Sequence, residues 1–344
     1  MAKKIGILTG GGDCPGLNPV IRAVVRRGLK EGYEFIGFKN GWKGIIENDT
    51  IFLNLDSVSG ILHKGGTILG TSRTNPYKKE GAVEKVKESF KSAGLEALVA
   101  IGGEDTLGVA NKLNEDKSIN VVGVPKTIDH DLSSTDYTFG FDTALNIATE
   151  CIDRLHTTAE SHHRIIVCEV MGRHAGWIAT EAGIAGGADM ILIPELAVDI
   201  DEVCEVLKKR HARGKTFSIV VVAEGAKFKE SSEVLQEEKL DEFGHVRLGG
   251  IGDRLARMIE SKTGFETRVS VLGHIQRGGS PTAFDRILGT RLGVKAMELV
   301  MEKKYGRMVA LSGVRIVDVP LAEAVKELKT VDMELYDIAR VFFG

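Results

Sequence analysis

Short apolar runs alternate with helix-like segments along this chain, and this alternation restricts its possible folds more than any other feature. Ile5–Thr9, Ala97–Ile101 and Val121–Val124 are three such runs, and glycine or proline follows each of them at once. The second half of the chain repeats the pattern at Ile165–Val170, Ile191–Ile193, Phe217–Ala223 and Val269–Leu272. Strands that alternate with helices predict right-handed βαβ units, and hence an α/β fold with mostly parallel sheets. Ligands of such folds bind at the carboxyl ends of the strands, where we expect the motifs described below to lie.

The length and charge of the chain set further limits. With 344 residues, of which 43% are hydrophobic and 27% are charged, it can form two domains, or one large α/β unit with a companion. The formal net charge is −3, so no overall field recruits nucleic acid or an anionic membrane. The four cysteines lack zinc-binding spacing, no apolar run approaches the length of a membrane span, and the amino terminus leaves no room for a signal peptide. We therefore expect a soluble cytoplasmic protein with reduced thiols.

One segment, at residues 227–250, interrupts the alternation of strands and helices. It is rich in charged side chains and contains glycine. The composition predicts a surface insertion, and the sequence leaves open whether that insertion forms a lid or an interface.

Two glycine-containing loops follow predicted strands and favour phosphate binding. Gly10–Gly12 follow the first strand, and Gly102–Asp105 follow the run at residues 97–101. Glycines let backbone N–H groups approach an anion closely, and the amino terminus of the next helix adds a positive dipole. Neither loop has the dinucleotide-binding pattern or the Walker A pattern. Two structural interpretations stay open, namely a tight turn at the first loop and helix capping by the acids of the second.

A third loop carries side chains suited to proton and metal chemistry. In Lys126–Asp131, alternation along an extended segment would place Thr127, Asp129 and Asp131 on one side. One carboxylate can then accept a hydroxyl proton while its neighbour faces a metal ion. His130 would point the other way, in a structural role. An aspartate-rich turn without catalytic function is the alternative.

Four arginines stand at the edges of predicted strands in the second half of the chain. They are Arg164, Arg173, Arg268 and Arg277. A guanidinium group binds phosphate through paired N–H donors, so the four together suit the dianion of a sugar phosphate. Surface salt bridges would explain any one of them separately.

Together these motifs resemble the 6-phosphofructokinase family over nearly the whole chain. The motifs that carry the resemblance appear in the order Gly11-Gly12-Asp13-x-Pro15-Gly16-x-Asn18, Gly66-Thr67-x-Leu69-Gly70, Pro125-x-Thr127-Ile128-Asp129-x-Asp131, Met171-Gly172-Arg173 and Gly273-His274-Ile275-Gln276-Arg277-Gly278-Gly279-Ser280-Pro281. The resemblance implies two Rossmann-like, three-layer α/β/α domains. Residues 1–140 and about 276–325 would form a larger domain that binds the phosphate donor. About 141–275 and 326–344 would form a smaller domain that binds the sugar phosphate.

The resemblance also implies roles for individual residues. Asp129 would accept the proton of the 1-hydroxyl of fructose 6-phosphate, with Lys126, Asp105 and Thr127 as its catalytic partners. Glu104, which stands where the family has aspartate, would bind Mg²⁺ together with Asp131. The donor-binding set would be Gly11, Gly12, Arg73, Asp105 and Lys126. The substrate-binding set would be Thr127, Ile128, Asp129, Arg164, Met171, Gly172, Arg173, Glu224, Arg268, His274, Ile275, Gln276 and Arg277.

Two of these arginines imply an oligomer. Arg164 and Arg268 resemble arginines that reach into the active site of a neighbouring subunit. The expected assembly is a homodimer or homotetramer whose subunits share active sites. His130 stands where the family pattern has asparagine, and the sequence assigns no role to that difference.

Two charged residues indicate which phosphate donor is used. ATP-dependent bacterial members of the family usually carry glycine at the position of Asp105 and commonly at that of Lys126, whereas pyrophosphate-dependent members carry charges there. A carboxylate about 4 Å from an ATP α-phosphate costs roughly 4 kcal/mol at an effective dielectric constant of about 20, or about three decades in binding. Pyrophosphate avoids this repulsion, and Lys126 can neutralise the leaving phosphate. The resemblance therefore predicts reversible, Mg²⁺-dependent transfer of a phosphoryl group from pyrophosphate to fructose 6-phosphate, a glycolytic step.

Three alternatives remain beside that prediction. The same reaction driven by ATP is the first. An enzyme like NAD kinase shares the Gly-Gly-acid loop, but it leaves the motif at His274–Arg277 unexplained. A non-catalytic regulatory subunit would be expected to have lost Asp129 or the arginines, and all of them are present.

Overall fold

The computed structural model describes residues 3–229 and 250–344, so most of the predicted insertion at 227–250 lies outside the described residues. The chain divides into two compact units. The first comprises residues 1–128, 132–143 and 277–328, and the second comprises residues 129–131, 144–276 and 329–344. The expected bounds placed Asp129–Asp131 in the first unit, whereas the structure places this short segment in the second.

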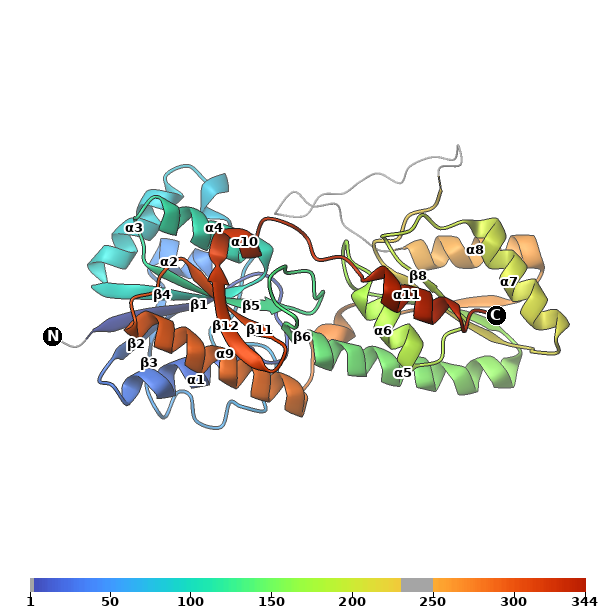
Figure 1. Ribbon diagram of the computed structural model, residues 1–344, viewed down its shortest axis with the longest axis horizontal. Coiled ribbons are helices and arrows are strands. Elements are labelled where there is room, and N and C mark those ends of the chain that lie inside the picture. The colour runs from blue at the N-terminus through green and yellow to red at the C-terminus, as the bar shows by residue number, and fades with distance from the viewer. Residues whose placement is uncertain (1–2, 230–249) are drawn as a thin grey trace. The chain divides into compact units, whose positions relative to one another are not determined.

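A single sheet forms the centre of the first unit (Figure 1). Its eight strands in the described chain are β1 (Lys4–Thr9), β2 (Glu34–Phe38), β3 (Thr50–Leu53), β4 (Leu95–Gly102), β5 (Val121–Thr127), β6 (Phe139–Gly140), β11 (Arg307–Ser312) and β12 (Arg315–Pro320). Their order is β12-β11-β5-β4-β1-β2-β3, and β6 pairs with β5. Pairing is parallel except at the two edges, where β3 and β12 run antiparallel to their neighbours. The predicted α/β fold with a mostly parallel sheet is confirmed for this unit.

Helices cover both faces of this sheet (Figure 1). On one face lie α1 (Leu17–Leu29) and α9 (Ala283–Met301), and on the other lie α2 (Trp42–Glu47), α3 (Ala82–Ser92), α4 (Glu104–Glu115) and α10 (Leu321–Ala324). A short 3₁₀ turn, η1 (Pro76–Lys78), precedes α3. A strand covered on both faces has to be apolar throughout, and seven of the eight residues of β4 are buried.

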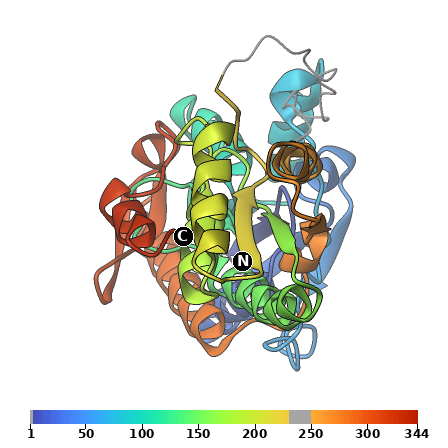
Figure 2. The same ribbon diagram turned by 90° about the vertical axis from the view of Figure 1, so that its right-hand side faces the viewer.

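The second unit contains a smaller sheet of four parallel strands among the described residues, in the order β10-β7-β9-β8. These strands are β7 (Ile165–Val170), β8 (Met190–Leu192), β9 (Ser218–Ala223) and β10 (Thr267–Val271). The helices of this unit are α5 (Phe141–His162), which begins in the first unit, α6 (Trp177–Ala185), α7 (Ile200–Ala212), α8 (Ile251–Thr263) and α11 (Met333–Arg340). Figures 1 and 2 show α7 and α8 next to each other over the strands, where they bury Leu207 and Ile259.

The ends of the strands position the motifs. In the first unit β1, β4 and β5 are neighbours, with Thr9 opposite Ile101 and Gly102 opposite Pro125. The loops that follow these three strands therefore emerge side by side at one edge of the sheet. No helix in the described chain is both long enough and apolar enough to cross a lipid bilayer.

Candidate active site

The first glycine loop lies pressed against its neighbours in the first unit. The N–H of Gly10 donates to the carbonyl of Ile101 (3.0 Å), and the N–H of Gly11 donates to the carbonyl of Ser72 (3.1 Å). A Cβ atom on Gly10 would stand 2.5 Å from the hydroxyl of Thr106. Gly11 has φ +81°, a value that favours glycine. These glycines are therefore needed for close packing as well as for backbone freedom.

Two cationic side chains reach this loop. Lys126 is 4% exposed, and its ammonium group donates a hydrogen bond to the carbonyl of Gly12. The guanidinium group of Arg277 donates to the carbonyl of Asp13 (3.3 Å), and a Cβ atom on Gly12 would stand 2.5 Å from Nη1 of Arg277. The structure thus brings Gly11, Gly12, Lys126 and Arg277 together in the first unit, as a site for a small anion requires.

The acids of the second loop begin a helix. Glu104 and Asp105 occupy the first turn of α4, after the N-cap residue Gly103, and Gly103 lies beside the carbonyl of Lys126. Glu104 is exposed and Asp105 is half-buried. Carboxylates in a first turn stabilise a helix through its dipole, so this structural contribution exists whatever their chemistry.

Arg73 and Cys14 are two further residues near the glycine loop, the first exposed and the second buried. Arg73 is exposed and directly follows Ser72, whose carbonyl binds the N–H of Gly11. Cys14 is buried, and burial raises the pKa of its thiol to about 12. At neutral pH this thiol is protonated, so Cys14 supplies no thiolate nucleophile beside the loop.

The segment after β5 does not keep the extended form predicted from the sequence. The strand ends at Thr127, the chain bends at Ile128 and Asp129, and His130 has φ +58°. A left-handed residue between two aspartates breaks the alternation that would have put Thr127, Asp129 and Asp131 on one side, so that part of the prediction is wrong. Asp129 is 4% exposed and His130 is 3% exposed. His130 belongs to the second unit, and its structural role stays a prediction.

A compact turn in the second unit carries several of the predicted substrate contacts. Met171, Gly172 and Arg173 follow β7, and Glu224 follows β9, so these four residues stand at the carboxyl end of the sheet. The backbone N–H of Arg173 donates to the carboxylate of Glu224 (3.2 Å). A Cβ atom on Gly225 would stand 1.7 Å from the carbonyl oxygen of Arg173, so the two turns lie in close contact.

The other two arginines lie at the opposite end of the same strands. Arg164 precedes β7, and Arg268 is the second residue of β10, the neighbouring edge strand. Both bind one carboxylate oxygen of Glu266, at 2.9 Å for Arg164 and 2.5 Å for Arg268, and the hydrogen bond from Arg164 holds the pKa of Glu266 below its ordinary value. The expectation that every motif lies at the carboxyl ends is therefore wrong for this pair. The six residues of β7, which span roughly 20 Å at about 3.3 Å per residue, separate Arg164 from the turn at Met171.

The motif after β10 forms a second 3₁₀ turn, η2 (Gly273–Arg277). The side chain of Gln276 is fully buried and donates to the carbonyl of Gly273 (3.3 Å), whereas Ile275 is 65% exposed. His274 lies within the same turn and is exposed. The buried amide of Gln276 therefore stabilises the turn that ends at Arg277.

The two predicted metal ligands, Glu104 and Asp131, are both carboxylates. Among the described residues, no three His, Cys, Asp or Glu side chains come together as a metal site. Magnesium usually takes one or two protein carboxylates and completes its shell with water and substrate phosphates, so it needs no such cluster. Glu104, an exposed carboxylate in the first turn of α4, has the chemistry of such a ligand.

Comparisons with known proteins agree with the fold and the motifs. The sequence pattern described as phosphofructokinase matches residues 4–300. The chain belongs to the phosphofructokinase family. The pyrophosphate–fructose 6-phosphate 1-phosphotransferase of Streptomyces coelicolor is 58% identical, over 99% of this chain and 100% of that protein. The ATP-dependent 6-phosphofructokinase of Mycobacterium tuberculosis is 53% identical, over 99% of this chain and 100% of that protein. The crystal structure of a pyrophosphate-dependent phosphofructokinase from Nitrosospira multiformis shares the fold, with a TM-score of 0.85, 21% identity, and coverage of 99% of this chain and 91% of that one.

Sequence reasoning missed a buried carboxylate that joins two helix ends of this phosphofructokinase. Asp285 in α9 accepts hydrogen bonds from the N–H of Gly140 (2.9 Å), the N–H of Thr143 (2.9 Å) and the hydroxyl of Thr143 (2.5 Å). In return, the N–H of Thr282 at the start of α9 donates to the hydroxyl of Thr143 (3.1 Å). Each helix thus helps to cap the other. An aspartate in a first helical turn, eight residues after Arg277, was the available signal, but its partners lie more than a hundred residues away.

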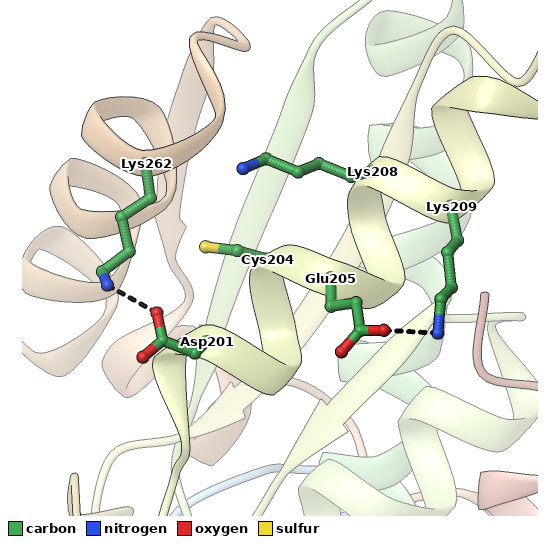
Figure 3. A pocket seen from close by; sticks show the side chains of 6 residues that line it. All are labelled: Asp201, Cys204, Glu205, Lys208, Lys209 and Lys262. Carbon is green, nitrogen blue, oxygen red and sulfur yellow. Dashed lines mark hydrogen bonds and ion pairs between the residues drawn. The ribbon is translucent and has the colours of Figure 1, made fainter.

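A hollow of about 430 Å³ between α7 and α8 lies apart from the residues assigned above (Figure 3). It is lined by Asp201, Cys204, Glu205, Lys208, Lys209 and Lys262. Two of its ammonium groups are paired with its own acids, Lys262 with Asp201 (2.5 Å) and Lys209 with Glu205 (2.6 Å). Its charges therefore largely satisfy one another, and nothing there indicates the chemistry of a phosphofructokinase.

Proposed function

We propose that this chain catalyses the reversible transfer of a phosphoryl group from pyrophosphate to the 1-hydroxyl of fructose 6-phosphate. The products are fructose 1,6-bisphosphate and phosphate. The observation that carries the proposal is the pair of charges at the first-unit loops, where Lys126 reaches Gly12 and Asp105 stands in the adjoining first turn of α4. The pyrophosphate-using relative at 58% identity gives this choice of donor further support.

In the proposed reaction the donor lies at the glycine loop. The glycines at 11 and 12 would let the two phosphates approach the loop closely, and Lys126 and Arg73 would bind them. Lys126 would neutralise the charge that develops on the leaving phosphate as the bridging P–O bond breaks. Asp105 would repel a donor that carries a third phosphate, and pyrophosphate has none.

Most of the residues assigned to the acceptor belong to the second unit. Asp129 would take the proton of the 1-hydroxyl, and the freed oxygen would form the new bond to phosphorus. Met171, Gly172, Arg173 and Glu224 would bind the sugar phosphate, together with Thr127, Ile128 and the motif His274, Ile275, Gln276 and Arg277. Because proton transfer to a carboxylate is reversible, Asp129 would serve in both directions.

We assign Mg²⁺ to Glu104 and Asp131. The ion would supply positive charge to the transferred phosphoryl group. Both side chains offer the hard oxygen ligands that Mg²⁺ prefers.

The assembly is proposed to be a homodimer or homotetramer. Arg164 and Arg268 stand at the end of β7 and β10 that is opposite the substrate turn, so they are poorly placed to reach that turn in their own chain. We infer that they bind the sugar phosphate held by a neighbouring subunit.

Donor choice is tested by product formation with pyrophosphate alone and with ATP alone. We expect kcat/KM with pyrophosphate to exceed that with ATP by at least about two decades. Asp105→Asn keeps the shape of the side chain and Asp105→Gly removes it, and both should improve the use of ATP. Glu115→Gln, at the far end of α4, is the matched control and should change neither donor. Equal rates with both donors in the unchanged enzyme would refute the choice of pyrophosphate.

The second candidate is the same reaction with ATP as the donor. The observation that favours it is the ATP-dependent mycobacterial relative, which is 53% identical over nearly the full length of both chains. Turnover with ATP in the absence of pyrophosphate, at a rate above that of pyrophosphate, would establish this candidate.

A further inference from the structure

The turn between Asp129 and Asp131 depends on a backbone conformation that its central residue rarely adopts. His130 has φ +58°, in the left-handed region. Non-glycine residues are uncommon there, although Asn, Asp and His tolerate it better than most. Such a residue keeps its conformation only where its surroundings hold it in place. The contacts of His130 therefore bear directly on how Asp129 is held.

A lysine from the carboxyl-terminal segment contacts the ring of His130. Nζ of Lys329 lies 2.9 Å from Nε2 of His130. An ammonium group only donates hydrogen bonds, so in this contact Nε2 of His130 is the acceptor. The two residues are 199 positions apart in the chain, and both belong to the second unit.

Trp177 completes the contact from the first residue of α6. Its ring meets the ring of His130 edge to face, with centroids 5.0 Å apart, and the ammonium group of Lys329 lies 5.1 Å from its centre. A cation over an indole ring is attracted by the negative face of that ring. We call His130, Lys329 and Trp177 the turn clamp.

Backbone hydrogen bonds fix Lys329 on both sides of the turn clamp. Its N–H donates to the carbonyl of Asp131 (2.9 Å), and its own carbonyl accepts from Nε1 of Trp177 (3.1 Å). The carboxylate of Glu195 then ties the two partners together, because it accepts from the N–H of Gly176, just before α6 (3.0 Å), and from the N–H of Val331 (2.9 Å). The backbone of Lys329 is thus held in position independently of the contact between its side chain and His130.

We propose that Lys329 and Trp177 are positioning residues that hold Asp129 in its working orientation by clamping His130. The inference rests on the proposed role of Asp129 as proton acceptor. The family pattern has asparagine at this position, a residue that tolerates the left-handed conformation. In this chain the ring of His130 stands there instead, and Lys329 and Trp177 both contact that ring. The turn clamp would act on the rate of proton transfer and leave the binding of fructose 6-phosphate nearly unchanged.

The main test replaces the ammonium group and keeps the stem of the side chain. Lys329→Met should lower kcat by about tenfold to a hundredfold, since a small misplacement of a reacting group can cost that much, with KM for fructose 6-phosphate changed less than about threefold. Lys329→Arg keeps the cation and should recover kcat to within about threefold of the unchanged enzyme. Lys326→Met is the control, because Lys326 lies three residues earlier with its side chain 75% exposed. Native kcat in Lys329→Met, a change confined to KM, or an equal loss in Lys326→Met would each overturn the proposal.

A second pair of variants keeps the test decisive if Lys329→Met folds poorly. His130→Gly retains the left-handed turn without the ring, and His130→Asn retains an acceptor as well. We expect His130→Asn to keep more activity than His130→Gly. Combining His130→Gly with Lys329→Met should cost no more than the worse single change, since the contact is already lost. Losses that multiply would mean that the two residues act independently, against the proposal.

Tryptophan emission separates this inference from the proposed function. The chain has two tryptophans, so Trp42→Phe leaves Trp177 as the single reporter beside the turn. In that background Lys329→Met should change the emission, whereas Lys326→Met should not, and unchanged emission would refute the contact itself. If Asp129→Asn stays active while the emission responds as expected, the assignment of Asp129 fails and the contact stands.

Discussion

Replacing Asp285 by asparagine should remove a pH-dependent cost from the stability of the fold. The carboxylate of Asp285 is fully buried and accepts hydrogen bonds from the N–H of Gly140 and from the N–H and hydroxyl of Thr143. These donors favour the ionised form, and the nearby charge of Asp142 opposes it. Loss of contact with water is the largest effect, and burial raises the pKa of Asp285 from 3.8 to about 6.

The direction and size of the cost follow from these two pKa values. The folded state binds the proton more readily than the unfolded state, so no cost exists below pH 3.8 and the full cost applies above about pH 6. A difference of about two pKa units corresponds to about 3 kcal/mol of unfolding free energy. Roughly half of this change falls between pH 5 and pH 8.

Urea unfolding followed by circular dichroism measures this change. The unchanged protein and Asp285→Asn should be compared at pH 5, 6, 7 and 8, at one protein concentration and without ligands. As the pH rises, the unfolding free energy of the unchanged protein should fall by about 1–2 kcal/mol relative to that of the variant. Groups that titrate equally in both proteins contribute equally to both unfolding free energies, so their contributions cancel in the difference.

Two results would refute this reasoning. A difference that stays constant with pH would mean that Asp285 titrates in the folded protein as it does in the unfolded chain. A difference that grows in favour of the unchanged protein as the pH rises would mean that the three donors outweigh burial. In that case the pKa of Asp285 would be lowered by folding.

Three further predictions concern the proposed site. Asp129→Asn keeps its shape but cannot accept the proton, so kcat should fall by about two to four decades in both directions, and near-native kcat would remove Asp129 from that role. Mixing inactive Asp129→Asn subunits with inactive Arg268→Ala subunits should restore partial activity if sites are shared. If no activity returns after confirmed subunit exchange, both residues act within one chain. Gly12→Ala should displace the guanidinium group of Arg277, which would lie 2.5 Å from the new Cβ atom. KM for fructose 6-phosphate should then rise by about one to two decades with an unchanged unfolding midpoint, and a native KM in Gly12→Ala would contradict it.

Strand positions could be predicted well where burial on both faces makes a strand apolar throughout. The run at Val121–Val124 became β5, and the run at Ile191–Ile193 became β8 with a shift of one residue. The edge strand β12 escaped notice, because it is half-exposed and carries charged residues among its apolar ones. Edge strands of this kind lack the continuous apolar run on which the prediction relied.

The candidate site could be predicted as motifs but not as contacts. Glycine loops and acidic residues can be recognised from short stretches of sequence, because backbone freedom and charge depend on the residues within each stretch. The contact of His130 with Lys329 and that of Asp285 with Gly140 could not be found in this way, because the partners lie 199 and 145 residues apart and only the folded chain brings them together. The left-handed turn at His130 could not be predicted either, because the same residues in the same order are compatible with an extended backbone and with a bend.

The strand β7 acts as a spacer of fixed length between two sets of functional groups. Its six residues separate Arg164 at one end from Met171 at the other, and hydrogen bonds to β9 and β10 set its register. Deleting one residue from β7 would shift one set by about 3.3 Å and turn the alternating side chains of the strand to the opposite face. If the two ends serve different subunits, such a deletion would damage a chain's own site and its neighbour's at once. Selection on catalysis would therefore preserve the length of this strand even where its apolar side chains are free to vary.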